Sequence, residues 1–128
     1  LWDALDAGTA QLWAAAWGAT PDPDMYQVYH SSNVVGLEGS SSSNHYQIQD
    51  PALDELIMTG RTTTDQAFRK ATYKDALELI MSWGVELPTY QRQEATLFST
   101  ERVNVDTIPG DMTPYYGWAA EIQNLELN

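Results

Sequence analysis

The fold of this chain is decided by one stretch, Trp17-Gly18-Ala19-Thr20-Pro21-Asp22-Pro23-Asp24-Met25-Tyr26. In it, a segment that ends at the aromatic residue Trp17 is followed by a turn rich in proline and aspartate. The signals of a helix start come directly after this turn. Asp22 is suited to be the N-cap, Pro23 fits the first helical position, and Asp24 adds a carboxylate to the first turn. The stretch therefore predicts a helix that begins at Asp22 and Pro23.

The segment before this turn is ambiguous. Residues 1–8 are acidic, compatible with a helix and end at a glycine. In residues 9–18, Trp13 and Trp17 share a face in a helix and in a strand alike, because a spacing of four residues fits both periods. The alanines favour a helix, whereas the short apolar run before Gly18 suits a buried strand, so both alternatives stay open.

The start signal recurs at Asp50-Pro51, and Gly60 is placed to end that helix. Thr63 and Gln66 fit a capping box for a longer helix that runs to about Trp83. Its expected buried residues are Phe68, Ala71, Ala76, Leu77, Ile80 and Met81.

Extended structure is expected in the last third of the chain. Gly84 stops the long helix, and residues 85–100 are rich in Thr, Tyr, Leu and Phe, which favour strands. A strand piece is predicted at 102–105 and a final strand at 118–127, and the serine run at 39–43 indicates a surface loop. The sequence thus predicts one domain over residues 1–128, of mixed α/β class.

The composition narrows the possible functions. Six basic and eighteen acidic residues give a net charge of −12, which makes nucleic acid an improbable partner and an anionic lipid surface a repulsive one. The chain has no cysteine, so disulfides and a cysteine nucleophile are excluded. No run approaches the ~20 apolar residues of a membrane span, so no membrane insertion is expected. Because the chain opens on Leu1 without a signal peptide, we expect it to be a piece of a longer protein.

The order of these parts resembles the family 5 extracellular solute-binding proteins, the oligopeptide- and dipeptide-binding type. The matching pieces span most of the chain and are Trp17-Gly18-Ala19, Asp22-Pro23-Asp24, Ser43-Asn44-His45-Tyr46, Asp50-Pro51-Ala52-Leu53-Asp54-Glu55-Leu56-Ile57, Arg69-Lys70-Ala71-Thr72-Tyr73-Lys74-Asp75-Ala76 and Glu86-Leu87-Pro88-Thr89-Tyr90. No single piece is specific, but six pieces in this order carry the resemblance.

The resemblance implies part of the C-terminal lobe of a type II periplasmic-binding-protein-like fold, with three helices packed on a small mixed sheet. It implies a bacterial, extracytoplasmic protein that captures peptides or solutes of similar size and delivers them to the permease of an ABC importer. No catalysis, catalytic residue or cofactor is expected. Removing the rest of such a protein would bare an apolar face and a sheet edge, so self-association of the fragment is expected.

The resemblance also supplies candidate ligand-binding residues. Trp17 matches an aromatic residue that lines the ligand cleft. Thr20 stands where peptide-binding members commonly place an aspartate that pairs with the α-ammonium, and Asp22 is a candidate to take over that role. Asn44 and Tyr46 border a loop that approaches the cleft, although a structural turn role is open for Asn44. Tyr90 and Arg92 follow Pro88, where the family presents side chains to the ligand, and Arg92 would suit a carboxylate.

Other interpretations stay open at this point. Trp13 and Trp17 are either a stacking platform or core residues, and Asp22 and Asp24 serve either a ligand or the helix start. The two histidines lack a metal-binding spacing, so no metal site is expected. The aromatic residues and carboxylates would also suit an oligosaccharide-binding protein or a carbohydrate-binding module. In a purely structural domain, the aromatic residues at 115–118 would form a partner surface.

Overall fold

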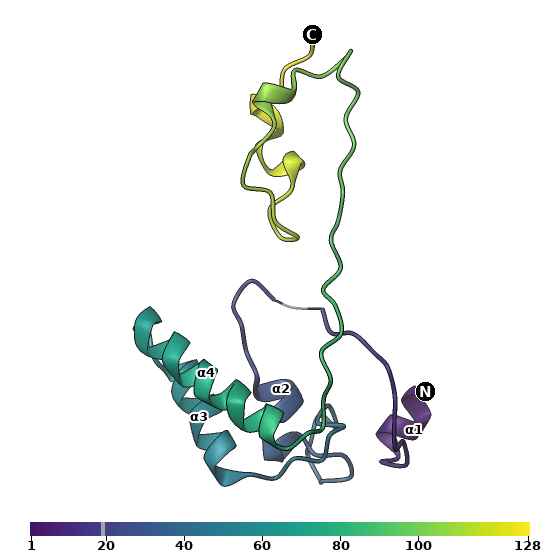
Figure 1. Cartoon of the computed structure of the whole chain (residues 1–128), viewed down its shortest axis with the longest axis vertical. Helices are drawn as coiled ribbons and strands as arrows, with labels where there is room; N and C mark the ends of the chain where they lie inside the picture. The colour runs from purple at the N-terminus through teal and green to yellow at the C-terminus, as the bar shows by residue number, and fades with distance from the viewer. Residues whose placement is uncertain (19) are drawn as a thin grey trace. The chain divides into compact units, whose positions relative to one another are not determined.

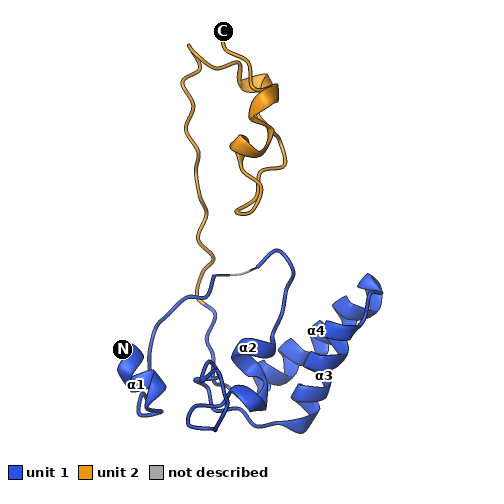
Figure 2. Ribbon diagram, turned by 180° about the vertical axis from the view of Figure 1, so that it is seen from behind, with its two compact units in different colours: residues 1–88 blue, residues 89–128 orange. Residues whose placement is uncertain are grey.

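The computed structural model of this chain describes residues 1–18 and 20–128, so Ala19 of the decisive stretch lies outside the described residues. The chain divides into two compact units, residues 1–88 and residues 89–128 (Figure 2). The chain has helices and almost no strand: the part that the structure describes has isolated β-bridges and no sheet. The predicted helices are therefore present, whereas the predicted small sheet and the grouping of both units into one domain stay predictions.

The first unit is built on two helices that lie side by side, α3 (Pro51–Thr62) and α4 (Gln66–Ser82) (Figure 1). The short helix α2 (Tyr26–Tyr29) packs against α3 and continues into the 3₁₀ turn η1 (Ser31–Asn33). A further short helix, α1 (Trp2–Asp6), opens the chain. Residues 9–18, which the sequence left open between helix and strand, form neither where the structure describes them.

Aspartate caps explain where the two long helices begin. The Oδ1 atom of Asp50 accepts hydrogen bonds from the amides of Ala52 and Leu53, as the Asp-Pro signal predicts. The predicted capping box of Thr63 and Gln66 is wrong, because Asp65 is the N-cap of α4. The Oδ1 atom of Asp65 accepts hydrogen bonds from the amides of Ala67 and Phe68. The Thr63 hydroxyl instead accepts a hydrogen bond from the amide of Asp65, before the helix begins.

The predicted start of the first helix at Asp22 and Pro23 is also wrong. Helix α2 begins at Tyr26, whose amide donates to Asp24 Oδ1 at 3.0 Å. Asp22 makes no cap, since its carboxylate is bound by Arg69 at 2.5 Å. The turn therefore extends three residues further than the local signals indicate, because the N-cap is Met25 and not Asp22.

Two glycines show where local signals hold and where packing overrides them. Gly84 has φ 63°, the left-handed conformation that ends α4 as predicted. Gly60 does not end α3, because it lies inside the helix with the Tyr73 ring against it. A Cβ atom at this position would lie 2.1 Å from Cε1 of Tyr73, so the glycine permits the close approach of α3 and α4.

The core of the first unit lies between α3, α4 and the turn before α3. Its buried residues are Ile48, Leu53, Ile57, Ala76 and Ile80. The predicted buried face of α4 is correct for Ala76 and Ile80 only. Phe68, Leu77 and Met81 are about half-exposed, and Thr72 and Tyr73 are buried in their place, because α4 packs on α3 through the face that carries Tyr73.

The second unit has little regular structure. It contains the 3₁₀ turns η2 (Val105–Thr107) and η3 (Trp118–Asn124), so the predicted final strand is wrong over most of its length. Val103 and Leu127 form an antiparallel bridge, which retains one contact of the predicted strands. Among the described helices, none combines the length and the apolar composition that a membrane crossing requires.

Candidate functional site

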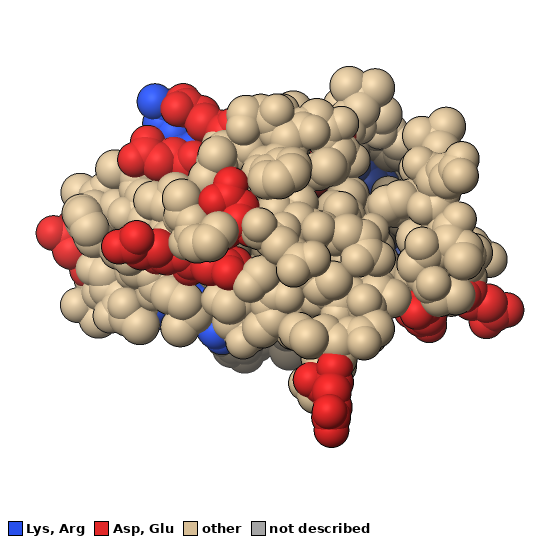
Figure 3. Space-filling model, turned by 90° about the horizontal axis from the view of Figure 1, so that it is seen from below, with Lys and Arg blue, Asp and Glu red and all other residues tan. Residues whose placement is uncertain are grey.

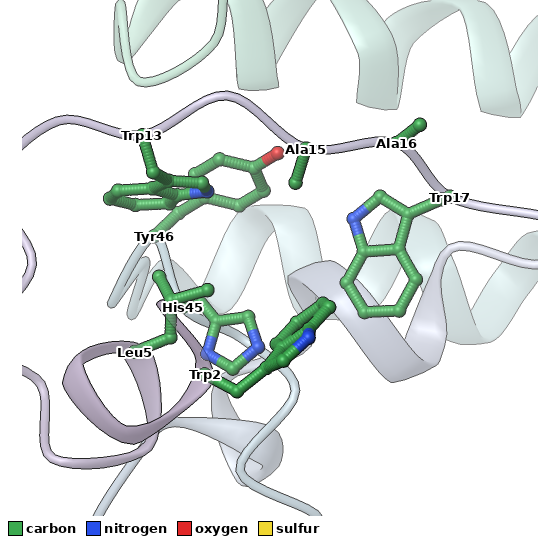
Figure 4. Close-up of a pocket in the computed structure, with 8 residues that line it drawn as sticks. All are labelled: Trp2, Leu5, Trp13, Ala15, Ala16, Trp17, His45 and Tyr46. Atoms are coloured by element: carbon green, nitrogen blue, oxygen red, sulfur yellow. The ribbon is translucent and has the colours of Figure 1, made fainter.

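Five aromatic rings of the first unit gather around a small cavity (Figure 4). We call this group the aromatic cluster; its members are Trp2, Trp13, Trp17, His45 and Tyr46. They come from three segments: α1, the irregular residues 13–17, and the turn that follows Asn44. Sequence reasoning singled out the tryptophans at 13 and 17 and, next to Asn44, Tyr46, but it gave no role to Trp2 or His45.

The His45 ring lies between two indoles. Its centroid is 6.4 Å from the Trp17 ring, nearly parallel at 16°, and 6.3 Å from the Trp2 ring at 51°. These distances are within the range of favourable aromatic pairs. The Nδ1 atom of His45 is buried and has no hydrogen-bond partner among the residues that the structure describes. The imidazole thus supports the inner face of Trp17 and leaves one polar atom unsatisfied.

A second stack continues the cluster toward the core. Trp13 stacks on Tyr46 at 5.7 Å and 27°, and Tyr46 stacks on Tyr29 at 5.6 Å and 5°. The Tyr29 hydroxyl donates to Glu86 Oε2 at 2.6 Å. Burial, together with this carboxylate, raises the pKa of Tyr29 well above its usual range, so its hydroxyl stays protonated. The stack therefore ties the irregular residues 13–17 to α2 and to the segment after α4.

The cavity itself is small. Its enclosed volume is about 10 Å³, no more than one water molecule needs. A ligand side chain would therefore contact the outer surface of the cluster, where Trp17 is 48% exposed. Trp2 is 58% exposed as well, whereas Trp13 is more deeply packed, so Trp17 and Trp2 are the indoles of the cluster that are available for stacking.

The structure holds two other predicted site residues beside the turn, outside the aromatic cluster. The Thr20 hydroxyl donates to the Asp22 carbonyl at 2.6 Å. Asp22 pairs with Arg69 of α4 at 2.5 Å, and Asp24 pairs with Arg61 of α3 at 3.2 Å. The Arg69 guanidinium holds the pKa of the Asp22 carboxyl below its usual value. Both carboxylates thus fasten the turn to the helices.

Asn44 is fully buried. Its Nδ2 atom donates to the carbonyls of Ile48 at 2.9 Å, His30 at 3.2 Å and Tyr29 at 3.3 Å. These bonds hold the turn that carries His45 and Tyr46, so in this structure Asn44 positions the aromatic cluster through the backbone.

The remaining predicted residues, Tyr90 and Arg92, belong to the second unit. Tyr90 is 86% exposed, and Arg92 forms an ion pair with Glu94. Their contact with a ligand stays a prediction.

A wider hollow lies between residues 21–25 and one face of α4, with a volume of about 920 Å³. Arg69, Lys70 and Lys74, half of the six basic residues of the chain, line it. Arg69 is bound by Asp22, and Lys74 pairs with Glu78 at 3.2 Å, so two of the three cations are already neutralised. Carboxylates otherwise dominate the charged groups of the molecule, as Figure 3 shows for one face.

No group of three or more histidine, cysteine or carboxylate side chains is arranged to hold a metal ion in the portion of the chain that the structure describes. The His30 and Ser32 side chains lie 2.9 Å apart, but His30 uses the same Nδ1 atom toward Ser32 and toward Asp54. A catalytic triad needs opposite ring nitrogens, so this group is a cap of η1 and not a nucleophile.

The aromatic cluster could be anticipated only in part. The positive φ of Gly8 (65°) lets the chain turn back after α1, which brings Trp2 toward His45. A glycine at the end of a helical segment was a visible signal of this turn, but nothing in the sequence indicated its packing partner. Comparison of the chain with protein-family models, with curated proteins and with solved structures gives no match.

Proposed function

We propose that this chain is part of the substrate-binding component of an ABC importer, and that it captures short peptides outside the cell membrane for delivery to the permease. In this proposal it is a portion of the C-terminal lobe of a type II periplasmic-binding-protein-like fold, whose helices pack on a small mixed sheet that is formed with the rest of the protein. It binds and releases its ligand unchanged, without a cofactor.

One observation carries the proposal: Trp17 presents a half-exposed indole whose inner side is stacked on His45. A ring held from behind loses little conformational freedom when a ligand stacks on its outer side. Stacked aromatic pairs contribute about 0.5–1.5 kcal/mol beyond the area they bury. A rigid indole at the surface is therefore suited to an aromatic or apolar peptide side chain.

The polar residues that follow Trp17 in the sequence indicate what kind of peptide would bind. The Thr20 hydroxyl is already donated to the Asp22 carbonyl, and the Asp22 carboxylate is already paired with Arg69. Neither residue offers a free carboxylate to an α-ammonium group. We therefore expect affinity to depend on side-chain stacking and to change little when the peptide N-terminus is acetylated.

An oligosaccharide is the second candidate ligand. The exposed indole of Trp17 that favours a peptide ring would also stack on the apolar face of a sugar ring. Affinity measurements distinguish the two candidate ligands, because only a peptide ligand would gain affinity from an aromatic side chain.

The experiment compares three ligand sets by isothermal titration calorimetry: short peptides with and without a Phe or Trp side chain, their N-acetylated forms, and short oligosaccharides. The Trp17→Ala variant removes the proposed platform. Trp83→Ala is its matched control, since Trp83 is 49% exposed and lies outside the aromatic cluster. We expect aromatic peptides to bind and Trp17→Ala alone to weaken them about tenfold. Binding of sugars only would favour the second candidate, and equal loss in both variants would overturn the role of Trp17.

A further inference from the structure

The stretch between the two helices of the first unit and the folded part of the second unit leaves its backbone unpaired. Over residues 85–98, no main-chain N–H or C=O group hydrogen-bonds to another described group of the chain. Figure 1 shows this run as a long uncoiled trace. Extended chain with free N–H and C=O groups is a template for pairing with another strand.

The side chains of the same run are exposed and favour strands. Tyr90 and Leu97 are 86% and 92% exposed, and threonines precede each of them. Thr, Tyr and Leu-rich extended segments fit a pleated, half-buried surface. The run therefore has both the backbone and the side chains of a β-strand without its neighbour.

The charged residues of this extended segment favour a second copy of the same chain as the pairing partner. Arg92 and Glu94 stand on either side of Gln93, on the same face of an extended chain. In an antiparallel pair of two copies with the two-fold axis at Gln93, residues whose numbers sum to 186 lie opposite each other. Arg92 of each copy then faces Glu94 of the other, so two ion pairs form across the axis.

We propose that two copies of this chain associate through residues 89–97 as an antiparallel pair of strands, with Arg92 of each copy opposite Glu94 of the other. In this register Tyr90 faces Thr96 and Thr89 faces Leu97, which are favourable cross-strand neighbours. The proposal goes beyond ligand capture and does not depend on it.

Other registers are opposed by charge. A shift of two residues in either direction places Arg92 opposite Arg92 or Glu94 opposite Glu94, and like charges directly opposite destabilise a pair. A parallel in-register pair also sets each charge against its own kind. Within one copy, Arg92 and Glu94 already form an ion pair, but both are exposed, so this pair contributes little and can exchange for the one between copies.

The experiment measures self-association by sedimentation equilibrium of the full chain from about 10 μM to about 1 mM, because a two-stranded pair is only marginally stable and the dimer is expected to be weak. Two single variants, Arg92→Glu and Glu94→Arg, each place like charges opposite each other. The double variant Arg92→Glu/Glu94→Arg restores complementary pairs. Both substituted positions carry exposed side chains, and circular dichroism checks that the fold is kept.

The design separates this register from general charge repulsion. Arg92→Glu changes the net charge from −12 by −2 to −14, whereas Glu94→Arg changes it by +2 to −10. General repulsion predicts weaker association for the first and tighter association for the second. The proposed register predicts that both single variants raise the dissociation constant about tenfold, since two like-charged pairs replace two ion pairs.

A mixture of the two single variants gives the most discriminating test of the proposed register. One chain then carries two acids and the other two bases at these positions, so we expect a heterodimer as tight as the dimer of the unchanged chain or tighter. The proposal is overturned if the unchanged chain is monomeric at about 1 mM, a concentration that detects even millimolar dissociation constants. It is also overturned if the single variants follow net charge, or if the mixture fails to associate.

Discussion

Arg69 of α4 joins the turn before α2 at two points: its Nη1 atom lies 2.5 Å from Asp22 Oδ1, and its Nη2 atom donates to the Pro23 carbonyl at 2.7 Å. The Arg69 side chain is largely covered, whereas Asp22 is exposed. One guanidinium therefore fixes both the carboxylate and the backbone of the turn at Asp22 and Pro23.

Replacing Arg69 by methionine should raise the pKa of the Asp22 carboxyl toward its usual value, because the guanidinium that lowers it is removed. A lowered pKa means that this interaction stabilises the folded chain above the unfolded pKa of about 3.9 and is lost as pH falls through the folded pKa. A carboxyl-detected NMR titration measures the change. Lys70→Met is the control on the same helix, and an unchanged Asp22 pKa in Arg69→Met would contradict the assignment.

The helix starts show what the sequence could predict. An N-cap aspartate acts on amides two and three residues ahead, so the start of α3 at Asp50 was visible in a few letters. Asp65 was missed because Thr63 offered an equally good local pattern three residues before Gln66. The competition between two adjacent caps is decided by geometry that the sequence does not express.

Tertiary contacts explain the other misses. Phe68, Leu77 and Met81 have helical spacing and were predicted to be buried, but α4 turns the face with Tyr73 toward α3. The aromatic cluster joins α1 to His45 across more than forty residues, and such contacts leave no period in the sequence. Local signals thus indicated most of the helices and the two tryptophans at 13 and 17 of the candidate site, while packing determined the rest.

Gly60→Ala should destabilise the first unit by about 1–3 kcal/mol, because the new methyl group would lie 2.1 Å from the Tyr73 ring. A loss of stability would be informative, because helix propensity alone predicts the opposite: alanine is favoured over glycine in a helix by about 1 kcal/mol when nothing obstructs it. Urea unfolding of the chain measures the change. In the background of Tyr73→Ala the same substitution should cost less or become favourable, and stabilisation of the unchanged background by Gly60→Ala would show that α3 and α4 do not approach closely here.

Asn44→Ala should lower the free energy of unfolding by about 1–3 kcal/mol, because the substitution removes a buried donor that serves three carbonyls. The loss should occur without any ligand, as expected for a residue that holds the turn carrying His45 and Tyr46. Ser43→Ala is the neighbouring control, since the Ser43 hydroxyl makes only exposed contacts with Gln27 and Ser41. A stable Asn44→Ala variant that had lost only ligand affinity would instead favour direct contact with the ligand.

The Tyr29 hydroxyl should ionise only well above the usual pH range of a tyrosine, because burial and the hydrogen bond to Glu86 raise its pKa. Its contribution to stability is then fully present below the unfolded pKa of about 10 and is lost as pH rises through the folded pKa, since the unfolded chain releases this proton first. We expect Tyr29→Phe to cost about 1–2 kcal/mol at neutral pH and progressively less above a pH of about 10. Urea unfolding at several alkaline pH values, with phenolate absorbance read in parallel, measures both effects. Tyr90→Phe, at an exposed position, should show neither, and a pH-independent cost of Tyr29→Phe would place the Tyr29 pKa at its ordinary value.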